Sequence, residues 1–169
     1  MFCDRGGAVV ESRKRGMRMQ DRYLFRGKRI DNGEWVHGYL FDDGFENGRV
    51  FIGGIVIEKY NGTACDDWNV TGINFYEIDP NTICQCTGLN DKNGKLIWEN
   101  DIVNGSIKRG AAFYRCLVLW NECKARFDVR AQSCNFPMTL DECTDDISMS
   151  GFDYEVLGNK FDNQELLEE

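Results

Sequence analysis

The chain has 169 residues, of which 42% are hydrophobic and 12% aromatic, and its formal net charge is −8 at pH 7. This apolar content suffices for a core and excludes an intrinsically disordered chain. No apolar stretch approaches the ~20 residues of a membrane-spanning helix, and the negative charge disfavours nonspecific binding to a nucleic-acid backbone. Many short apolar runs, with 18 Gly and only two Pro, predict a mainly β protein rich in tight turns.

The first 18 residues differ from the rest, because five basic residues against two acidic ones give them a net charge of +3. Their run Ala8-Val9-Val10 is too short for a secretory signal. Two interpretations remain: a basic tail that touches nucleic acid or a partner, or a start assigned too far upstream, with translation beginning at Met17 or Met19 rather than Met1. We favour the second, under which removing +3 changes the net charge from −8 to −11.

We accordingly divide the chain into an extension at residues 1–18, disordered or not translated, and a β domain at residues 19–169. The β domain is long enough to comprise two small subdomains that share a core.

A β-hairpin is expected from Tyr23 to Phe41, with Ile30–Glu34 as its turn and Trp35–Leu40 as its returning strand. Basic side chains next to aromatic ones make this hairpin the one candidate for nucleic-acid contact, since small barrels bind single strands through such side chains. The candidate residues are Arg22, Arg26, Lys28 and Arg29. The alternative is a solvated basic face, which the negative charge of the chain favours.

Two apolar strands should follow, Val50–Ile52 and Ile55–Ile57, separated by the break Gly53-Gly54. The polar segment from Lys59 to Gly72 is expected to be a surface loop with one large apolar side chain, Trp68.

The segment Gln85–Val103 contains two tight turns around one short strand. Asp91–Gly94 has the composition of a hairpin turn, because Asn-Gly tolerates positive φ. Glu99–Asp101 redirects the chain, with Asn100 as the residue expected in the left-handed region. We expect Asp91 and Asp101 to be turn-forming rather than catalytic side chains.

The remainder predicts further strands at Phe113–Trp120 and Ala125–Arg130 by period-two alternation, and a closing strand at Phe152–Leu157. Asn163 is expected to cap a short C-terminal helical turn that ends at Leu166-Leu167.

Three parts of the chain together resemble one family. The segment Gln85–Val103 is similar to Q-x-T-G-L-x-D-K-N-G-K-x-I-x-E-G-D-I-V of the YopX-like proteins of bacteriophages and prophages. Tyr23–Lys28 with Gly33–Val36 resembles the N-terminal hairpin of that family, and Tyr154–Leu167 resembles its closing Y-E-V-I-G-N-I-x-x-N-P-E-L-L. The resemblance spans about residues 22–167 and implies SH3-like small barrels with extra hairpins. It carries no catalytic residue over.

Two departures from the family pattern are conservative in backbone terms. Asn100 stands where Gly is usual and keeps access to the left-handed region. Gln164 stands where Pro is usual at the first turn of a helix, which gives up a preset φ without excluding the turn.

Catalytic and metal chemistry finds little support in the sequence. His37 is the only histidine, and no catalytic base or nucleophile lies near it in the sequence. The acidic pairs Asp42-Asp43, Asp66-Asp67 and Asp145-Asp146 fit solvated turns better than a divalent-metal site. Eight cysteines without a Cys-x2-Cys pair predict free thiols in a reducing cytosol rather than zinc or disulfides. We therefore expect neither an enzyme nor a cofactor.

The sequence favours a cytoplasmic phage or prophage accessory protein of the bacterial host cell, acting as a non-enzymatic binding or assembly module. We expect self-association into a homo-oligomer, with a phage or host protein as a further partner and neither nucleic acid nor a membrane. The alternatives are a nucleic-acid-binding small barrel and an acidic mimic of DNA that inhibits a host protein. The candidate interface residues, chosen because Trp and Tyr often anchor interfaces, are Trp35, Tyr39, Trp68 and Trp98. Burial in a barrel core is the alternative for each.

Overall fold

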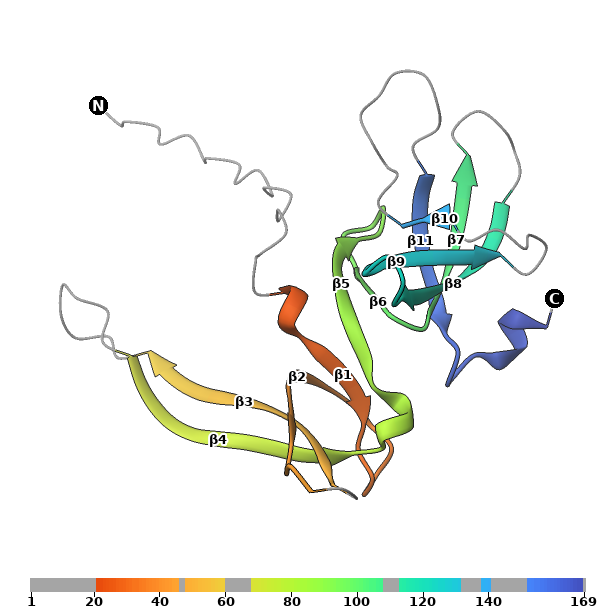
Figure 1. Ribbon diagram of the computed structural model, residues 1–169. Coiled ribbons are helices and arrows are strands. Elements are labelled where there is room, and N and C mark those ends of the chain that lie inside the picture. The colour runs from red at the N-terminus through yellow and green to blue at the C-terminus, as the bar shows by residue number, and fades with distance from the viewer. Residues whose placement is uncertain are drawn as a thin grey trace, which may run out of the picture.

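Two antiparallel sheets make up the described part of the protein in the computed structural model (Figure 1). The structure describes residues 21–45, 48–59, 68–107, 113–131, 138–140 and 152–168. The predicted extension at residues 1–18 and the pairs Asp66-Asp67 and Asp145-Asp146 lie outside these ranges. The prediction of a mainly β fold is confirmed, since the described helical segments are three short 3₁₀ turns.

The first sheet has the strand order β4-β3-β2-β1-β5-β6. Its strands are β1 (Phe25–Lys28), β2 (Trp35–Asp42), β3 (Val50–Lys59), β4 (Trp68–Ile78), β5 (Cys84–Asn90) and β6 (Leu96–Trp98). Two 3₁₀ turns belong to this part of the chain: η1 (Asp21–Tyr23) precedes β1, and η2 (Pro80–Thr82) precedes β5. The second sheet has the order β10-β9-β8-β7-β11. It comprises β7 (Asp101–Ile107), β8 (Phe113–Asn121), β9 (Arg126–Ala131), β10 (Met138–Thr139) and β11 (Phe152–Asn159), followed by η3 (Gln164–Leu167).

The N-terminal hairpin forms as predicted. Lys28 and Trp35 form the last strand pair before the turn of the hairpin, and within that turn Gly33 has a φ of 73°. The sheet then curls, and a single β-bridge joins Arg29 to Ile78 at the far end of β4. Ile52 and Ile78 are fully buried inside the curl. Neither sheet is closed by a continuous ladder in the described residues, so the predicted barrel is not seen as such.

Strands β3 and β4 correct two expectations. The pair Gly53-Gly54 does not break the chain, because β3 is continuous and pairs with β4 along its whole length. A Cβ on Gly53 would lie 2.1 Å from the carbonyl oxygen of Asn74 and 2.6 Å from the ring of Phe75. Glycine thus allows close packing within a strand here rather than ending one. The predicted surface loop was also too long, since residues 68–72 belong to β4.

The two turns of Gln85–Val103 have the predicted geometry. Gly94 has a φ of 82° and donates its backbone N–H to the carbonyl of Asp91, and Asn100 has a φ of 64°. Between these turns, β6 alternates its side chains between two cores. Ile97 packs into the core of the second sheet, whereas Trp98 packs with Cys84 and Cys86 of β5. The signature strand therefore holds the two sheets together.

The second sheet confirms the predicted strands at β8, β9 and β11. Its core consists of side chains that are at most 6% exposed: Ile97, Val103, Cys116, Val118, Val129, Ala131, Leu140 and Tyr154. The C-terminal turn forms as η3 with Asn163 at its N-cap position, as predicted, but the side chain of Asn163 makes no capping hydrogen bond. Its Oδ1 instead accepts from the backbone N–H of Asn159, because the chain folds back on itself between β11 and η3.

Candidate binding surface

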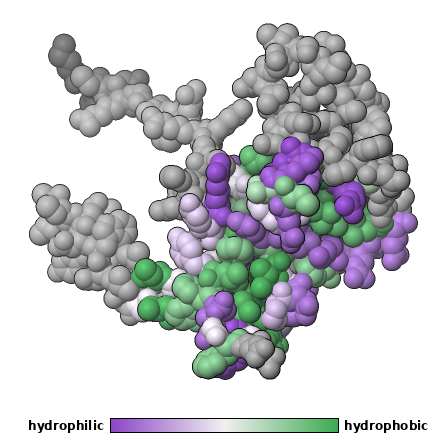
Figure 2. Space-filling model, viewed as in Figure 1, coloured by the Kyte–Doolittle hydropathy of each residue, from purple (hydrophilic) through white to green (hydrophobic). Residues whose placement is uncertain are grey.

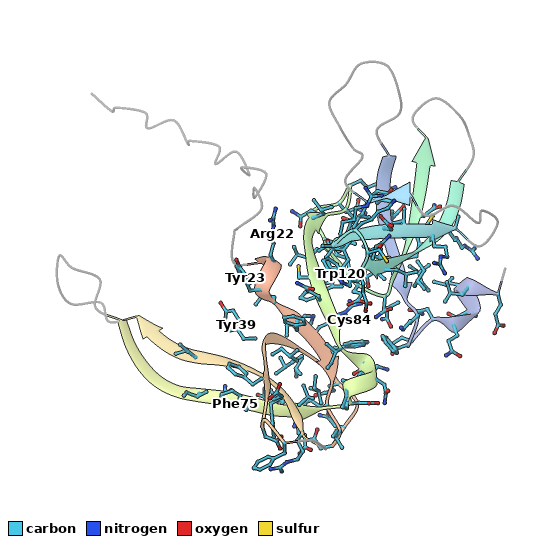
Figure 3. All side chains as sticks on the ribbon, viewed as in Figure 1. Arg22, Tyr23, Tyr39, Phe75, Cys84 and Trp120 are labelled. Carbon is cyan, nitrogen blue, oxygen red and sulfur yellow. The ribbon has the colours of Figure 1, made fainter. Side chains whose placement is uncertain are left out.

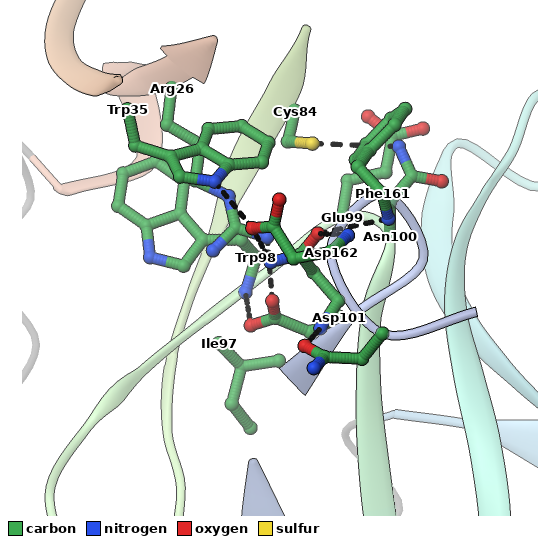
Figure 4. A network of polar contacts seen from close by, with 12 residues as sticks. Arg26, Trp35, Cys84, Ile97, Trp98, Glu99, Asn100, Asp101, Phe161 and Asp162 are labelled. Atoms are coloured by element: carbon green, nitrogen blue, oxygen red, sulfur yellow. Dashed lines mark hydrogen bonds and ion pairs between the residues drawn. The ribbon is translucent and has the colours of Figure 1, made fainter. Parts of the chain in front are cut away.

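A buried ion pair joins the two sheets. Arg26 of β1 and Asp101, the first residue of β7, meet with Nη2 and Oδ1 2.6 Å apart (Figure 4). The second carboxylate oxygen of Asp101 accepts from the backbone N–H of Trp98 at 2.9 Å. Burial raises the pKa of Asp101, against the opposing effect of the Arg26 charge. Asp101 thus supports a turn, as predicted, but also pairs with a residue 75 positions away.

Aromatic rings enclose the guanidinium of Arg26. Its Cζ lies 4.8 Å from the ring centre of Trp35 and 5.5 Å from that of Trp98, in the range of cation–π contacts. His37 packs against Trp98 from the neighbouring strand, with ring centroids 5.1 Å apart. Burial, and secondarily the charge of Arg26, lowers the pKa of His37, so this ring is neutral at pH 7. The position of His37 is therefore explained by its ring contact with Trp98, and no catalytic role is needed to account for it.

The C-terminal segment is fastened to the outside of this cluster by Asp162. Its carboxylate accepts from Lys28 Nζ, from Trp35 Nε1 at 2.7 Å and from Asn159 Nδ2 at 2.9 Å. Phe161 packs on Trp35 beside it, with ring centroids 5.8 Å apart. These hydrogen bonds outweigh the cost of burial and lower the pKa of Asp162 to about 2.

Asp162 predicts a specific acid sensitivity. Because its folded pKa of about 2 lies below the ordinary 3.8, its contribution is complete above pH 3.8 and is lost as the pH falls towards 2. The carboxylate is partly exposed, so solvent screening reduces the contribution to about 1 kcal/mol. In Asp162→Asn, the unfolding free energy from urea titrations should fall less steeply than in wild type between these pH values. Identical slopes would contradict this role.

The four candidate nucleic-acid contacts do not form one free basic surface. Arg26 is buried, Lys28 is paired with Asp162, and Arg29 donates from Nε to Asp31 at 2.8 Å. Of the four, Arg22 alone forms no ion pair with a carboxylate among the described residues, and its side chain is exposed. The basic residues are therefore largely engaged within the chain.

An apolar surface lies on the outer side of β2, β3 and β4. Directly paired residues of antiparallel strands share a face, and the register aligns Tyr39, Gly53 and Phe75 across the sheet, with Ile55 opposite Ile73 further out. We call the following five side chains, which are 42–60% exposed, the apolar face: Tyr39, Phe41, Ile55, Ile73 and Phe75.

The figures show how the apolar face is arranged. Tyr39 and Phe75 project on the same side of the arm formed by β3 and β4 (Figure 3). Hydrophobic residues run along this arm into the body of the protein (Figure 2). Phe41 and Phe75 stack edge to face with centroids 5.0 Å apart, so neighbouring side chains hold part of the face in place.

A family model described as YopX protein matches residues 24–168. The chain belongs to the YopX protein family. The matched residues include every strand of both sheets and both turns of the signature. A search of curated proteins found no match.

Within this YopX-family chain, the four predicted interface residues have different surroundings. Tyr39 belongs to the apolar face, whereas Trp98 is only 6% exposed and is part of the core. Trp35 is half-buried against Phe161, and the side chain of Trp68 lies outside the described residues. Sequence reasoning missed Ile55, Ile73 and Phe75, which the alternation along β3 and β4 would have indicated had both been recognised as single strands.

Other chemistry finds no site in the described residues. They contain no group of three or more His, Cys, Asp or Glu side chains placed to hold a metal ion. Cys84, Cys86 and Cys116 are buried and Cys123 is exposed. Burial raises the pKa of Cys84, which opposes thiolate formation. Asp42 and Asp43 accept backbone N–H groups of the following turn. No helix among the described residues is long and apolar enough to cross a membrane.

Proposed function

We propose that this YopX-family protein is a phage or prophage accessory protein that acts in the bacterial cytoplasm as a non-enzymatic assembly module, by associating with further copies of itself. The observation that supports the proposal is the apolar face, which the described residues leave exposed. Ile55 and Ile73 are paired across β3 and β4, and each is 60% exposed. Contiguous exposed apolar side chains on a soluble domain mark an interaction site.

The arm that carries this face is expected to be only marginally stable when it is surrounded by water. β2 pairs with β3 only from Val50 to Gly53, so beyond Gly53 the sheet narrows to β3 and β4 alone (Figure 1). We call this part, residues 54–59 of β3 and 68–74 of β4, the ribbon. An isolated two-stranded hairpin is at best marginally stable, and burial of one face is what usually stabilises it.

We also infer that the curled part of the first sheet is the SH3-like element of this family. The bridge between Arg29 and Ile78, with Ile52 buried inside the curl, supports this inference. In this view the ribbon is an addition to the barrel that serves binding.

Light scattering coupled to size exclusion tests the proposed function. Across a wide concentration range we expect a mass of at least twice the 19.4 kDa of one chain. Added salt should strengthen the association, because copies with a net charge of −8 repel one another. A mass of one chain at every concentration and salt level would contradict the proposal.

A further inference from the structure

We propose that two copies of this chain pack ribbon on ribbon through the apolar face, around a two-fold axis that places Ile73 of each copy next to Ile73 of the other. The inference rests on the self-association proposed above and specifies its surface and symmetry. An isologous contact of this kind uses the same patch on both copies and closes as a dimer.

The two sides of the ribbon differ in a way that selects one of them. The apolar side carries Ile55 and Ile73, and Phe75 lies at its base. On the opposite side of the ribbon, the register pairs Gly54 with Asn74 and Val56 with Gly72. Space around both glycines is open, since a Cβ on either would contact nothing within 4 Å. The exposed side chains described on the ribbon's apolar side are Ile55 and Ile73, and association through that side would remove both from water.

Packing by the face is favoured over pairing by the edges. The β3–β4 register shifts between Val56 and Ile57, within the ribbon. Such a bulge twists a strand and disrupts the regular array of N–H and C=O groups that edge pairing needs. The exposed isoleucine pair, by contrast, lies on the flat of the ribbon.

Two observations identify the occupant as a second copy. The five side chains of the apolar face are uncharged on a chain with a net charge of −8, so two copies can meet there with the least repulsion. The same face of β2 is already a packing surface nearer the body. There Phe161 packs on the half-buried Trp35, and Trp98 packs against His37, which stays exposed. The apolar face continues this packing surface along the arm, where its five side chains are 42–60% exposed.

A charge-pairing experiment tests the geometry. Ile73→Lys and Ile73→Glu are each expected to weaken self-association about tenfold or more, because each places two like charges at the centre of the contact. Mixed in equal amounts, the two variants should recover a dimer of one Lys and one Glu chain. Asn74→Lys and Asn74→Glu, on the opposite side of the ribbon, are the matched controls and should associate like wild type. Light scattering and thermal unfolding of each sample supply the mass and the check of folding.

The outcomes separate the two proposals. Wild-type association together with unchanged association of the Ile73 variants would overturn the ribbon contact and leave the assembly function standing. Loss in both single variants without recovery in the mixture would overturn the two-fold contact at Ile73. A monomeric wild type would overturn both proposals. If an Ile73 variant unfolds, Ile55→Lys and Ile55→Glu test the face itself: both should weaken self-association, and unchanged association in both would overturn the ribbon contact.

Discussion

Replacing Asp101 with Ala is expected to lower the free energy of unfolding by about 3–5 kcal/mol, the usual cost of breaking a buried ion pair by removing one partner. Arg26 would keep its charge between two indole rings and lose its carboxylate at 2.6 Å. Among the described residues, Arg26 Nε already has no hydrogen-bond partner. The backbone N–H of Trp98 would lose its acceptor as well. Urea unfolding of the purified variant measures the change.

Two controls isolate the cause. The double variant Arg26→Met with Asp101→Leu removes both charges and should recover much of the lost stability, because apolar replacement of a whole buried pair is often neutral. Asp31→Ala breaks an exposed pair with Arg29 and should leave the unfolding free energy nearly unchanged, because solvent screens such pairs. If Asp101→Ala lowers the free energy of unfolding by less than about 1 kcal/mol, the ion pair between the two sheets does not stabilise the fold as proposed.

The second large effect is expected for Asp91→Ala, at about 2–3 kcal/mol, because three partly buried N–H donors would lose their acceptor together. One carboxylate accepts three backbone N–H groups: those of Asn93 at 2.8 Å, Lys95 at 2.9 Å and Val156 at 3.1 Å. The first two belong to the hairpin turn and the third to β11. The residue thus ties the turn to the last strand.

Asp91→Asn separates these two roles. An amide oxygen in place of Oδ1 keeps the bonds to Asn93 and Lys95, while an amide NH2 in place of Oδ2 faces the N–H of Val156. We expect an intermediate loss, measured by urea unfolding, and faster amide hydrogen exchange at Val156. Asp79→Ala, which removes a cap at η2, is the local control and should cost about 1 kcal/mol. Equal losses in Asp91→Asn and Asp91→Ala would place the whole effect in the contact with Val156.

Local features of the fold were predictable because they depend on neighbouring residues. The positive φ of Asn100, the turn at Gly94 and the N-terminal hairpin follow from turn chemistry within a few positions. The pair Gly53-Gly54 misled the prediction, because a glycine that ends a strand and a glycine beneath an aromatic ring look the same in the sequence. Only the register, which brings Phe75 opposite Gly53, distinguishes them.

The binding surface and the polar network were less predictable, because they depend on long-range pairing. Nothing near Arg26 or Asp101 in the sequence indicates that the two meet. Trp98 was chosen for its residue type, but alternation along β6 directs it into a core. Asn163 has the composition of a cap, and the fold-back at Asn159 redirects its side chain. The ion pair crosses the two sheets, whereas Trp98 and Asn163 are positioned by contacts with β5 and with the end of β11.

The position of β11 at the edge of the second sheet has a consequence for how the protein folds during synthesis. Strands β1 to β4 lie within residues 25–78 and pair with their neighbours in the chain, so the curled sheet can form early. The open edge of β7 stays unpaired until β11 has been synthesised, and β11 begins about 45 residues after the end of β7. We expect prematurely terminated chains to retain the first sheet, to expose Val103 and Ile97, and to be removed by proteolysis.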